Sequence, residues 1–132
     1  NLLNELVKSN YEVMLETGGS LSISDVPKEV IKIVDFKCPS SAMEKKNLWS
    51  IVDDLQPHDE VKFVIGNRED FDWAKDRITE YSLDKICTLL FSPTFEKIDP
   101  QLIVEWILVE NLPVRMQMQM HKMIWSPDKQ GV

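Results

Sequence analysis

The segment from Val114 to Trp125 places polar side chains suited to ligand binding at every second position. Gln117, Gln119 and His121 alternate with methionines, and a period of two residues is typical of a β-strand. Two amides and an imidazole can donate and accept hydrogen bonds along a planar polar ligand. Leaving such groups buried and unpaired costs roughly 1–3 kcal/mol each. The same alternation also fits an edge strand whose polar side faces water, so both interpretations stay open.

The reactive side chains elsewhere show no pattern of a catalytic or metal site. Cys38 and Cys87 lie far apart in the sequence, and neither has a histidine at a metal-ligand spacing. This favours buried structural thiols over a nucleophile or a metal ligand. Gly18-Gly19 carries neither GxGxxG nor the Lys-Ser/Thr pair of a phosphate-binding loop.

The composition describes an acidic globular chain. Its 132 residues include 15 basic and 22 acidic side chains, for a formal charge of −7, which argues against a nucleic-acid backbone as partner. The pairs Asp53-Asp54 and Asp70 with Asp72 are most simply interpreted as solvated faces. With 43% hydrophobic residues, we expect one domain over 1–132. No apolar run approaches the roughly 18 residues of a membrane span, and two separate cysteines fit the reducing cytoplasm.

Hydrophobic patterning predicts strands that alternate with helices. The expected strands are Tyr11–Glu16, Ile31–Lys37, Glu60–Ile65, Ile86–Phe91 and Val114–His121. The expected helices cover 1–9, Asn47–Leu55, Arg68–Tyr81 and Asp99–Asn111, with a tail from Trp125. Such alternation implies right-handed βαβ crossovers, so the predicted fold class is α/β with about five parallel strands.

Polar clusters follow all five expected strands. In parallel sheets and barrels, ligands bind at the edge where the strands end. One cluster alone is most simply a loop, but five at one edge favour a ligand-binding rim. They are Glu16-Thr17-Gly18-Gly19, Lys37-Cys38-Pro39-Ser40-Ser41, Gly66-Asn67-Arg68-Glu69, Ser92-Pro93-Thr94-Phe95 and His121-Lys122.

Five segments, taken together and in order, carry a resemblance to a known family. They closely resemble the 7-carboxy-7-deazaguanine synthases, which are radical S-adenosylmethionine (SAM) enzymes of queuosine biosynthesis, a tRNA modification pathway. The likeness covers essentially the whole chain. The segments are Leu15–Gly19, Ile33–Ser41, His58–Gly66, Leu90–Pro93 and Val114–Lys122.

The resemblance implies the C-terminal part of an incomplete (β/α)6 radical SAM barrel, with the cluster-binding motif and the magnesium-binding Ser/Thr in an N-terminal part that this chain lacks. The full-length lyase is expected to convert 6-carboxy-5,6,7,8-tetrahydropterin to 7-carboxy-7-deazaguanine with loss of ammonia. Its cofactors would be SAM, a [4Fe–4S] cluster and Mg²⁺. Neither catalytic nor metal-binding residues are expected in this chain, which alone should be inactive and bind neither the cluster nor Mg²⁺.

Site residues follow from the resemblance position by position. SAM-binding positions are Cys38, Pro39 and Ser40 in one loop and Ser92, Pro93, Thr94 and Phe95 in another. Pro127 matches a substrate contact of the family, although this chain continues to Val132. Two assignments go beyond the family. Glu16 would accept the ribose hydroxyls of SAM, while Gln117, Gln119 and His121 would point into the barrel toward the pterin, with their methionine neighbours against the outer helices.

The expected partners are a small-molecule pterin and a second copy of the chain, with no nucleic acid or membrane. The strand Tyr11–Glu16 should pair with a preceding strand that this chain lacks, so its free edge favours a homodimer. A free-standing, non-catalytic α/β ligand-binding domain is the alternative function.

Overall fold

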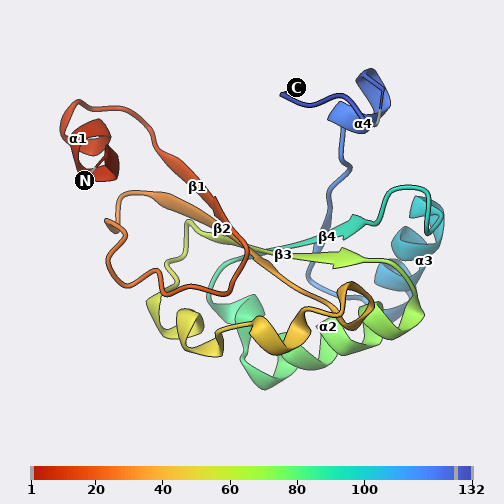
Figure 1. Ribbon diagram of the computed structural model, residues 1–132. Coiled ribbons are helices and arrows are strands. Elements are labelled where there is room, and N and C mark those ends of the chain that lie inside the picture. Colours follow the sequence, from red (N-terminus) through yellow and green to blue (C-terminus); the bar gives the residue numbers. More distant parts are fainter. Residues whose placement is uncertain (1, 127, 132) are drawn as a thin grey trace.

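A single parallel sheet organises the structure, a computed structural model that describes residues 2–126 and 128–131. Its five strands lie side by side in the order of the sequence and all run in parallel, which confirms the predicted α/β class (Figure 1). This stepwise order is consistent with a partial barrel. The strands are β1 (Met14–Thr17), β2 (Ile31–Phe36), β3 (Glu60–Ile65), β4 (Thr88–Pro93) and β5 (Arg115–Met116).

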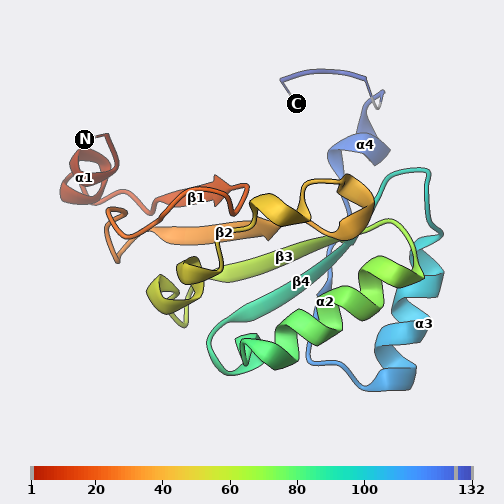
Figure 2. The same ribbon diagram turned by 60° about the horizontal axis from the view of Figure 1, so that its bottom comes forward.

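The two long helices cover the same face of this sheet. They are α2 (Arg68–Glu80) and α3 (Pro100–Glu110), and Figures 1 and 2 show both on one side of the strands. Two shorter helices, α1 (Leu2–Lys8) and α4 (His121–Ile124), rise on the other side at the two ends of the sheet (Figure 1). Short 3₁₀ helices cover Pro39–Ser41, Glu44–Lys46, Trp49–Asp54 and Leu83–Lys85. None of the described helices covers the middle of that second face, which we call the open face.

Aromatic side chains fill the layer between the sheet and the helices. Phe36, Phe63 and Phe91 project from three neighbouring strands and are fully buried. The Phe71 ring of α2 lies 5.4 Å from that of Phe91 and 5.3 Å from that of Trp106 on α3. Edge-to-face pairs of this kind contribute about 0.5–1.5 kcal/mol each beyond the area they bury. The core therefore lies on the helix side and leaves the opposite side chains of the strands free for other roles.

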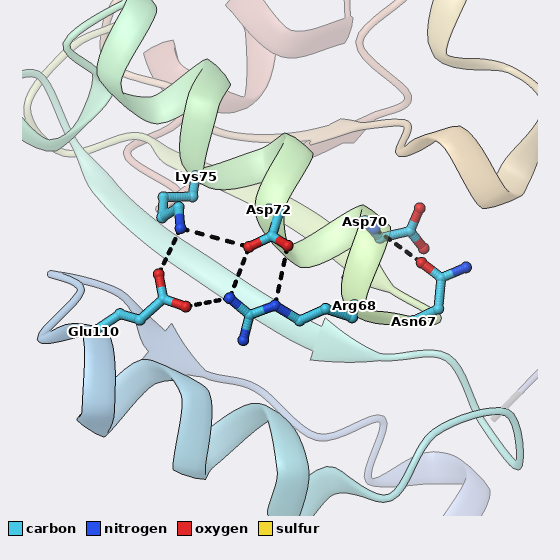
Figure 3. Close-up of polar contacts among 6 residues, drawn as sticks. All are labelled: Asn67, Arg68, Asp70, Asp72, Lys75 and Glu110. Carbon is cyan, nitrogen blue, oxygen red and sulfur yellow. Dashed lines mark hydrogen bonds and ion pairs between the residues drawn. The ribbon is translucent and has the colours of Figure 1, made fainter.

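An ion-pair network joins α2 to α3 (Figure 3). Arg68 donates to both carboxylate oxygens of Asp72 at 3.0 and 2.8 Å, and it also donates to Glu110. Lys75 lies 2.6 Å from Glu110 and 3.5 Å from Asp72. Hydrogen bonds from Arg68 lower the pKa of Asp72, and hydrogen bonds from Lys75 and Arg68 lower the pKa of Glu110. The four side chains are partly exposed, so the network adds modestly to stability.

The last predicted strand is largely wrong. Only Arg115 and Met116 form β5, although the backbone N–H of Gln117 still donates to the Phe91 carbonyl at 2.8 Å. The chain then bends, with the Met120 amide 3.0 Å from the Met118 carbonyl, and continues into α4. Methionine and glutamine favour helices and lack the branched or aromatic shape typical of strands. Alternation alone was therefore a weak basis for a long strand.

Other boundaries moved by smaller amounts. The strand predicted at Tyr11–Glu16 begins at Met14, and the strand predicted at Ile86–Phe91 runs from Thr88 to Pro93. The segment predicted as the helix Asn47–Leu55 forms a 3₁₀ helix over Trp49–Asp54. Among the described residues, no helix has the length and the apolar character that crossing a bilayer requires.

Candidate functional site

The loops at the carboxyl end of the sheet surround a hollow of about 390 Å³. We call it the carboxyl-edge hollow, and it lies within the size range of small-molecule sites. The loop after β2 meets the start of the loop after β4 there, because parallel strands end at one edge. Its lining includes four predicted site residues and five others: Cys38, Ser40, Thr94 and Gln119, with Asp35, Lys37, Ser41, Val64 and Lys97.

A second hollow of about 390 Å³ lies on the open face. We call it the open-face hollow, and Gln119 lines it as well as the carboxyl-edge hollow. Taken together, the two hollows are lined by most of the side chains that sequence reasoning assigned to ligands. The lining residues are Glu16, Lys62, Ser92, Gln117, Met118, Gln119, Met120 and His121.

The facing predicted for the Gln-Met segment is correct only at its start. Met116 packs against the helix-side core, and Gln117 lies on the open face. Met118 and Met120 are 37% and 64% exposed, so the prediction that they pack against the outer helices is wrong. The reason is the end of β5 at Met116, beyond which side chains no longer alternate between two faces.

The Gln119 amide is an unusual feature of this site. Its Oε1 atom is buried and has no hydrogen-bond partner among the described residues. A buried acceptor without a donor costs about 1–3 kcal/mol, so it is a natural contact point for a ligand N–H group. Gln119 also lines a smaller, mostly apolar hollow of about 220 Å³ together with Pro93, Thr94 and Phe95. The Lys122 ammonium lies 5.2 Å from the Phe95 ring centre.

Asp70 lies at the junction of the loops, and its interpretation as a solvated residue is wrong. Its side chain is fully buried and accepts three hydrogen bonds. The Ser40 amide donates to Oδ1 at 2.9 Å, the Gly66 amide donates to Oδ2 at 2.8 Å, and the Ser40 hydroxyl also donates to Oδ2. The carboxylate therefore links the loop after β2 to the turn after β3.

Gly66 allows this junction to close. A methyl group at Gly66 would lie 3.0 Å from the Ser40 Oγ, 3.2 Å from the Asp70 Oδ2 and 3.2 Å from the Thr94 Oγ1. The Thr94 amide in turn donates to the Ile65 carbonyl at 2.8 Å. Three successive loops thus meet around a position where an added methyl group would require its neighbours to shift by a few tenths of an ångström.

The Cys38 thiol is buried beneath this junction. It is 2% exposed, and burial is the main reason why its pKa is raised, with Asp70 and Asp35 adding to the effect. A protonated, inaccessible thiol is a poor nucleophile, in agreement with the structural role expected from the sequence. The Cys87 thiol is partly buried, and its pKa is raised to about 11 by burial.

Sequence reasoning missed a group of charged side chains on the open face. The Lys37 ammonium lies 2.9 Å from the Asp35 Oδ2, and the Lys62 ammonium lies 3.9 Å from the same atom. The other Asp35 oxygen is buried without a partner in the described part of the chain. Glu16 lines a further hollow with these three residues. Charges at alternate positions of otherwise apolar strands were the signal that might have revealed them.

Two further predicted residues lie at the starts of short helices. Pro39 begins a 3₁₀ helix, and His121 is exposed at the start of α4, where it lines the open-face hollow. Pro127 lies outside the described residues. In the part of the chain that the structure describes, no group of three or more His, Cys, Asp or Glu side chains is placed to hold a metal ion.

No family model matches the chain, but several curated proteins are similar to it over nearly its whole length. The 7-carboxy-7-deazaguanine synthase of Koribacter versatilis is 38% identical over 98% of this chain and 63% of its own length. The synthase of the same name from Chlorobaculum tepidum is 38% identical over 99% of this chain and 61% of its own length. That of Clostridium acetobutylicum is 37% identical, with 99% and 62% covered. The chain thus spans about three fifths of the length of these relatives, and the resemblance seen in the sequence is confirmed.

Proposed function

Because the chain is related to the 7-carboxy-7-deazaguanine synthases along nearly all of its length, we propose that it forms the C-terminal portion of such an enzyme. The complete protein would be a radical SAM carbon–nitrogen lyase of queuosine biosynthesis. It would convert 6-carboxy-5,6,7,8-tetrahydropterin to 7-carboxy-7-deazaguanine and release ammonia. The observation that carries the proposal is 38% identity over 98% of the chain.

SAM binds at the carboxyl-edge hollow in this proposal, and its chemistry there is to supply the radical that starts the reaction. The hollow has the size of a cofactor site, and the Ser40 and Thr94 side chains offer hydroxyl groups at its wall. Cys38 and Pro39 would contribute through their backbone, because the Cys38 thiol is buried. Phe95, which lines the adjoining apolar hollow beside Pro93, offers a flat surface for the adenine ring.

The pterin binds in the open-face hollow. Its ring edge carries N–H donors beside a carbonyl acceptor, and primary amides such as Gln117 and Gln119 can satisfy both kinds of group. Gln119 already presents a buried oxygen without a donor. Ser92 and Lys62 add a hydroxyl and a positive charge to the same wall. Glu16, which lies near the end of β1 and lines the open-face hollow, would accept the ribose hydroxyls of SAM from that side.

The cluster and Mg²⁺ belong to another part of the complete protein. About two fifths of the length of the relatives is not matched by this chain, and the proposal assigns both groups to that part. The complete protein would be cytoplasmic. Residues 1–132 alone would pair with a second copy through the edge strand β1, where Tyr11 just before the strand and Met14 at its start are 66% and 58% exposed; in the complete protein a preceding strand would cover this edge.

One pair of assays tests the assignment of function. The complete gene product, reconstituted anaerobically, should form 7-carboxy-7-deazaguanine from the pterin, whereas residues 1–132 alone should show neither a [4Fe–4S] signal nor SAM cleavage. A gene without a three-cysteine motif upstream of Asn1 would instead support the free-standing ligand-binding domain. A [4Fe–4S] spectrum with SAM cleavage from the isolated chain would also contradict the proposal.

A second assay tests the placement of the pterin. Gln119→Leu in the complete protein should weaken pterin binding about tenfold, the value of one good buried hydrogen bond. Uncoupled SAM cleavage should fall less than pterin binding, because Ser40 and Thr94 stay in place although Gln119 also lines the carboxyl-edge hollow. Equal losses of pterin binding and SAM cleavage would place Gln119 elsewhere.

A further inference from the structure

Asp70 makes an arrangement that its own helix does not require. The start of α2 is already capped, because the Asn67 Oδ1 accepts from the Asp70 amide at 2.8 Å (Figure 3). An acidic residue at this third helical position often bonds back to the amide of the capping residue. Here the side chain instead accepts from the Gly66 amide and from two groups of Ser40. The carboxylate therefore serves the loops rather than the helix.

Burying the Asp70 carboxylate, which has no cationic partner in the part of the chain that the structure describes, costs free energy that its hydrogen bonds must offset. Asp70 is fully buried, and none of the ion pairs among the described residues includes it. Its carboxylate points away from Arg68 and the network that joins α2 to α3 (Figure 3). A buried carboxylate needs its full set of donors. Here only neutral donors of two loops supply them.

We propose that Asp70 is the positioning residue of the SAM site: it fixes the Ser40 hydroxyl as a donor toward the protein, so that Ser40 can only accept a hydrogen bond from the ligand. This inference rests on the proposed function. A serine hydroxyl has one proton and two lone pairs, and its proton is committed to the Asp70 Oδ2. Ser40 is nonetheless exposed and lines the carboxyl-edge hollow. The matching ligand group is therefore a donor, such as a ribose hydroxyl or an amino group.

The substitution Asp70→Asn keeps the shape of the side chain but changes its hydrogen bonding. An amide has one oxygen and one NH₂ group, so it cannot accept all three hydrogen bonds that Asp70 accepts. With the NH₂ group in the place of Oδ2, the Ser40 hydroxyl would accept from Asn and turn its own proton toward the ligand, while the Gly66 amide would lose its acceptor. A ligand donor would then face a second donor. SAM affinity should fall about tenfold, the loss of one good hydrogen bond.

A double-mutant cycle in the complete protein separates positioning from general destabilisation. SAM affinity is measured by calorimetry for Asp70→Asn, Ser40→Ala and the double variant, and melting temperatures are recorded in parallel. If Asp70 acts through Ser40, the double variant should bind SAM no more weakly than Ser40→Ala alone. Additive losses, or wild-type affinity in Asp70→Asn, would overturn the inference. If Asp70→Asn does not fold, wild-type affinity in Ser40→Ala would overturn it as well.

A matched control lies at the opposite edge of the sheet. Asp59 is also fully buried, and its carboxylate accepts from backbone amides at 2.8 and 2.7 Å. Asp59→Asn should lower the melting temperature without changing SAM affinity, because Asp59 does not line the carboxyl-edge hollow. Failure of the unsubstituted protein to bind SAM would overturn the proposed function, and this inference with it. SAM binding with an additive cycle would overturn this inference alone.

Discussion

The two edges of the sheet each contain a fully buried aspartate, but the two carboxylates are satisfied in different ways. At the amino edge, Asp59 faces the Lys32 ammonium at 3.1 Å, and Lys32 itself is 2% exposed. At the carboxyl edge, Asp70 has no cationic partner among the described residues and accepts from Ser40 and Gly66. The buried pair of Lys32 and Asp59 connects β2 to the turn before β3, and each charge is satisfied by the other. A carboxylate whose hydrogen bonds come only from loops holds those loops in one conformation. A binding site needs loops that are fixed in this way.

The different partners of Asp59 and Asp70 show when a buried carboxylate indicates a functional site. Asp59 lies among secondary-structure elements, where its bonds to the Lys32 and Gln56 amides fix the first residues of β2 and the turn before β3. Asp70 lies beside a hollow, and one of its donors is an exposed serine. The same residue type with the same burial can therefore be structural at one edge and set up a ligand contact at the other. The partners decide between the two.

The largest effect should come from removing the amino-edge carboxylate. In Asp59→Ala, the buried Lys32 ammonium keeps just one acceptor within the described part of the chain, the Val30 carbonyl at 3.3 Å. Breaking a buried ion pair in this way costs about 3–5 kcal/mol of unfolding free energy. Asp70→Ala should cost less, about 1–3 kcal/mol, because water can reach the exposed Ser40. Urea unfolding followed by circular dichroism measures both.

A double replacement is the control for this contrast. Lys32→Met with Asp59→Leu removes both charges and should recover the part of the lost stability that comes from the unpaired Lys32 ammonium, but not the part that comes from the Lys32 and Gln56 amides, which lose their acceptor in both variants. Equal destabilisation by Asp59→Ala and Asp70→Ala would remove the proposed difference between the two edges.

Much of this architecture could be predicted from the sequence, whereas the buried carboxylates could not. The hydrophobic pattern of β3 and the Asp99-Pro100 start of α3 predicted both elements, because local patterning and capping determine them. The Asp70 side chain is buried by contacts to Ser40, which is 30 positions away in the sequence. The amide of Lys32 reaches Asp59 over 27 positions. Pairings of this length leave no periodic signal, so both acidic residues resemble surface residues until the fold is known.

The candidate site shows the same division. The location of the candidate ligand-binding loops followed from the parallel strands, since their carboxyl ends must meet at one edge. The open-face group of Asp35, Lys37 and Lys62 depends on register between β2 and β3, where Asp35 pairs with Lys62. The early end of β5 was missed because the prediction relied on the alternation alone, although neither Met nor Gln is among the residue types that favour strands.

A medium effect should distinguish two glycines at the carboxyl edge. Gly66→Ala would press a methyl group against Ser40, Asp70 and Thr94, at a cost of about 1–3 kcal/mol from overpacking. Gly18→Ala is the matched control, because its methyl group would meet only the Lys37 Cε at 4.0 Å. That change should be neutral or stabilising by about 0.4–1 kcal/mol. Thermal unfolding would measure both, and equal stability of the two variants would refute a tightly closed junction around Gly66.

The smallest effect on stability should come from replacing Glu110, a carboxylate of α3 that lies at neither edge of the sheet. Glu110 is paired with Arg68 and Lys75 at a partly exposed position, so Glu110→Gln should lower the unfolding free energy at pH 7 by about 0.5–1 kcal/mol. The pKa of Glu110 lies below its ordinary 4.5 in the folded protein, and that of Asp72 lies below 3.8. The pairing therefore stabilises the protein fully above these ordinary values and is lost as the pH falls through the lower folded values. Urea titrations from pH 7 down to about pH 3 should show the two proteins converging, and high salt should also reduce the difference. Glu105→Gln on the same helix is the control: Glu105 accepts only from Gln101, so a similar loss there would show that the α2–α3 network contributes nothing beyond helix surface charge.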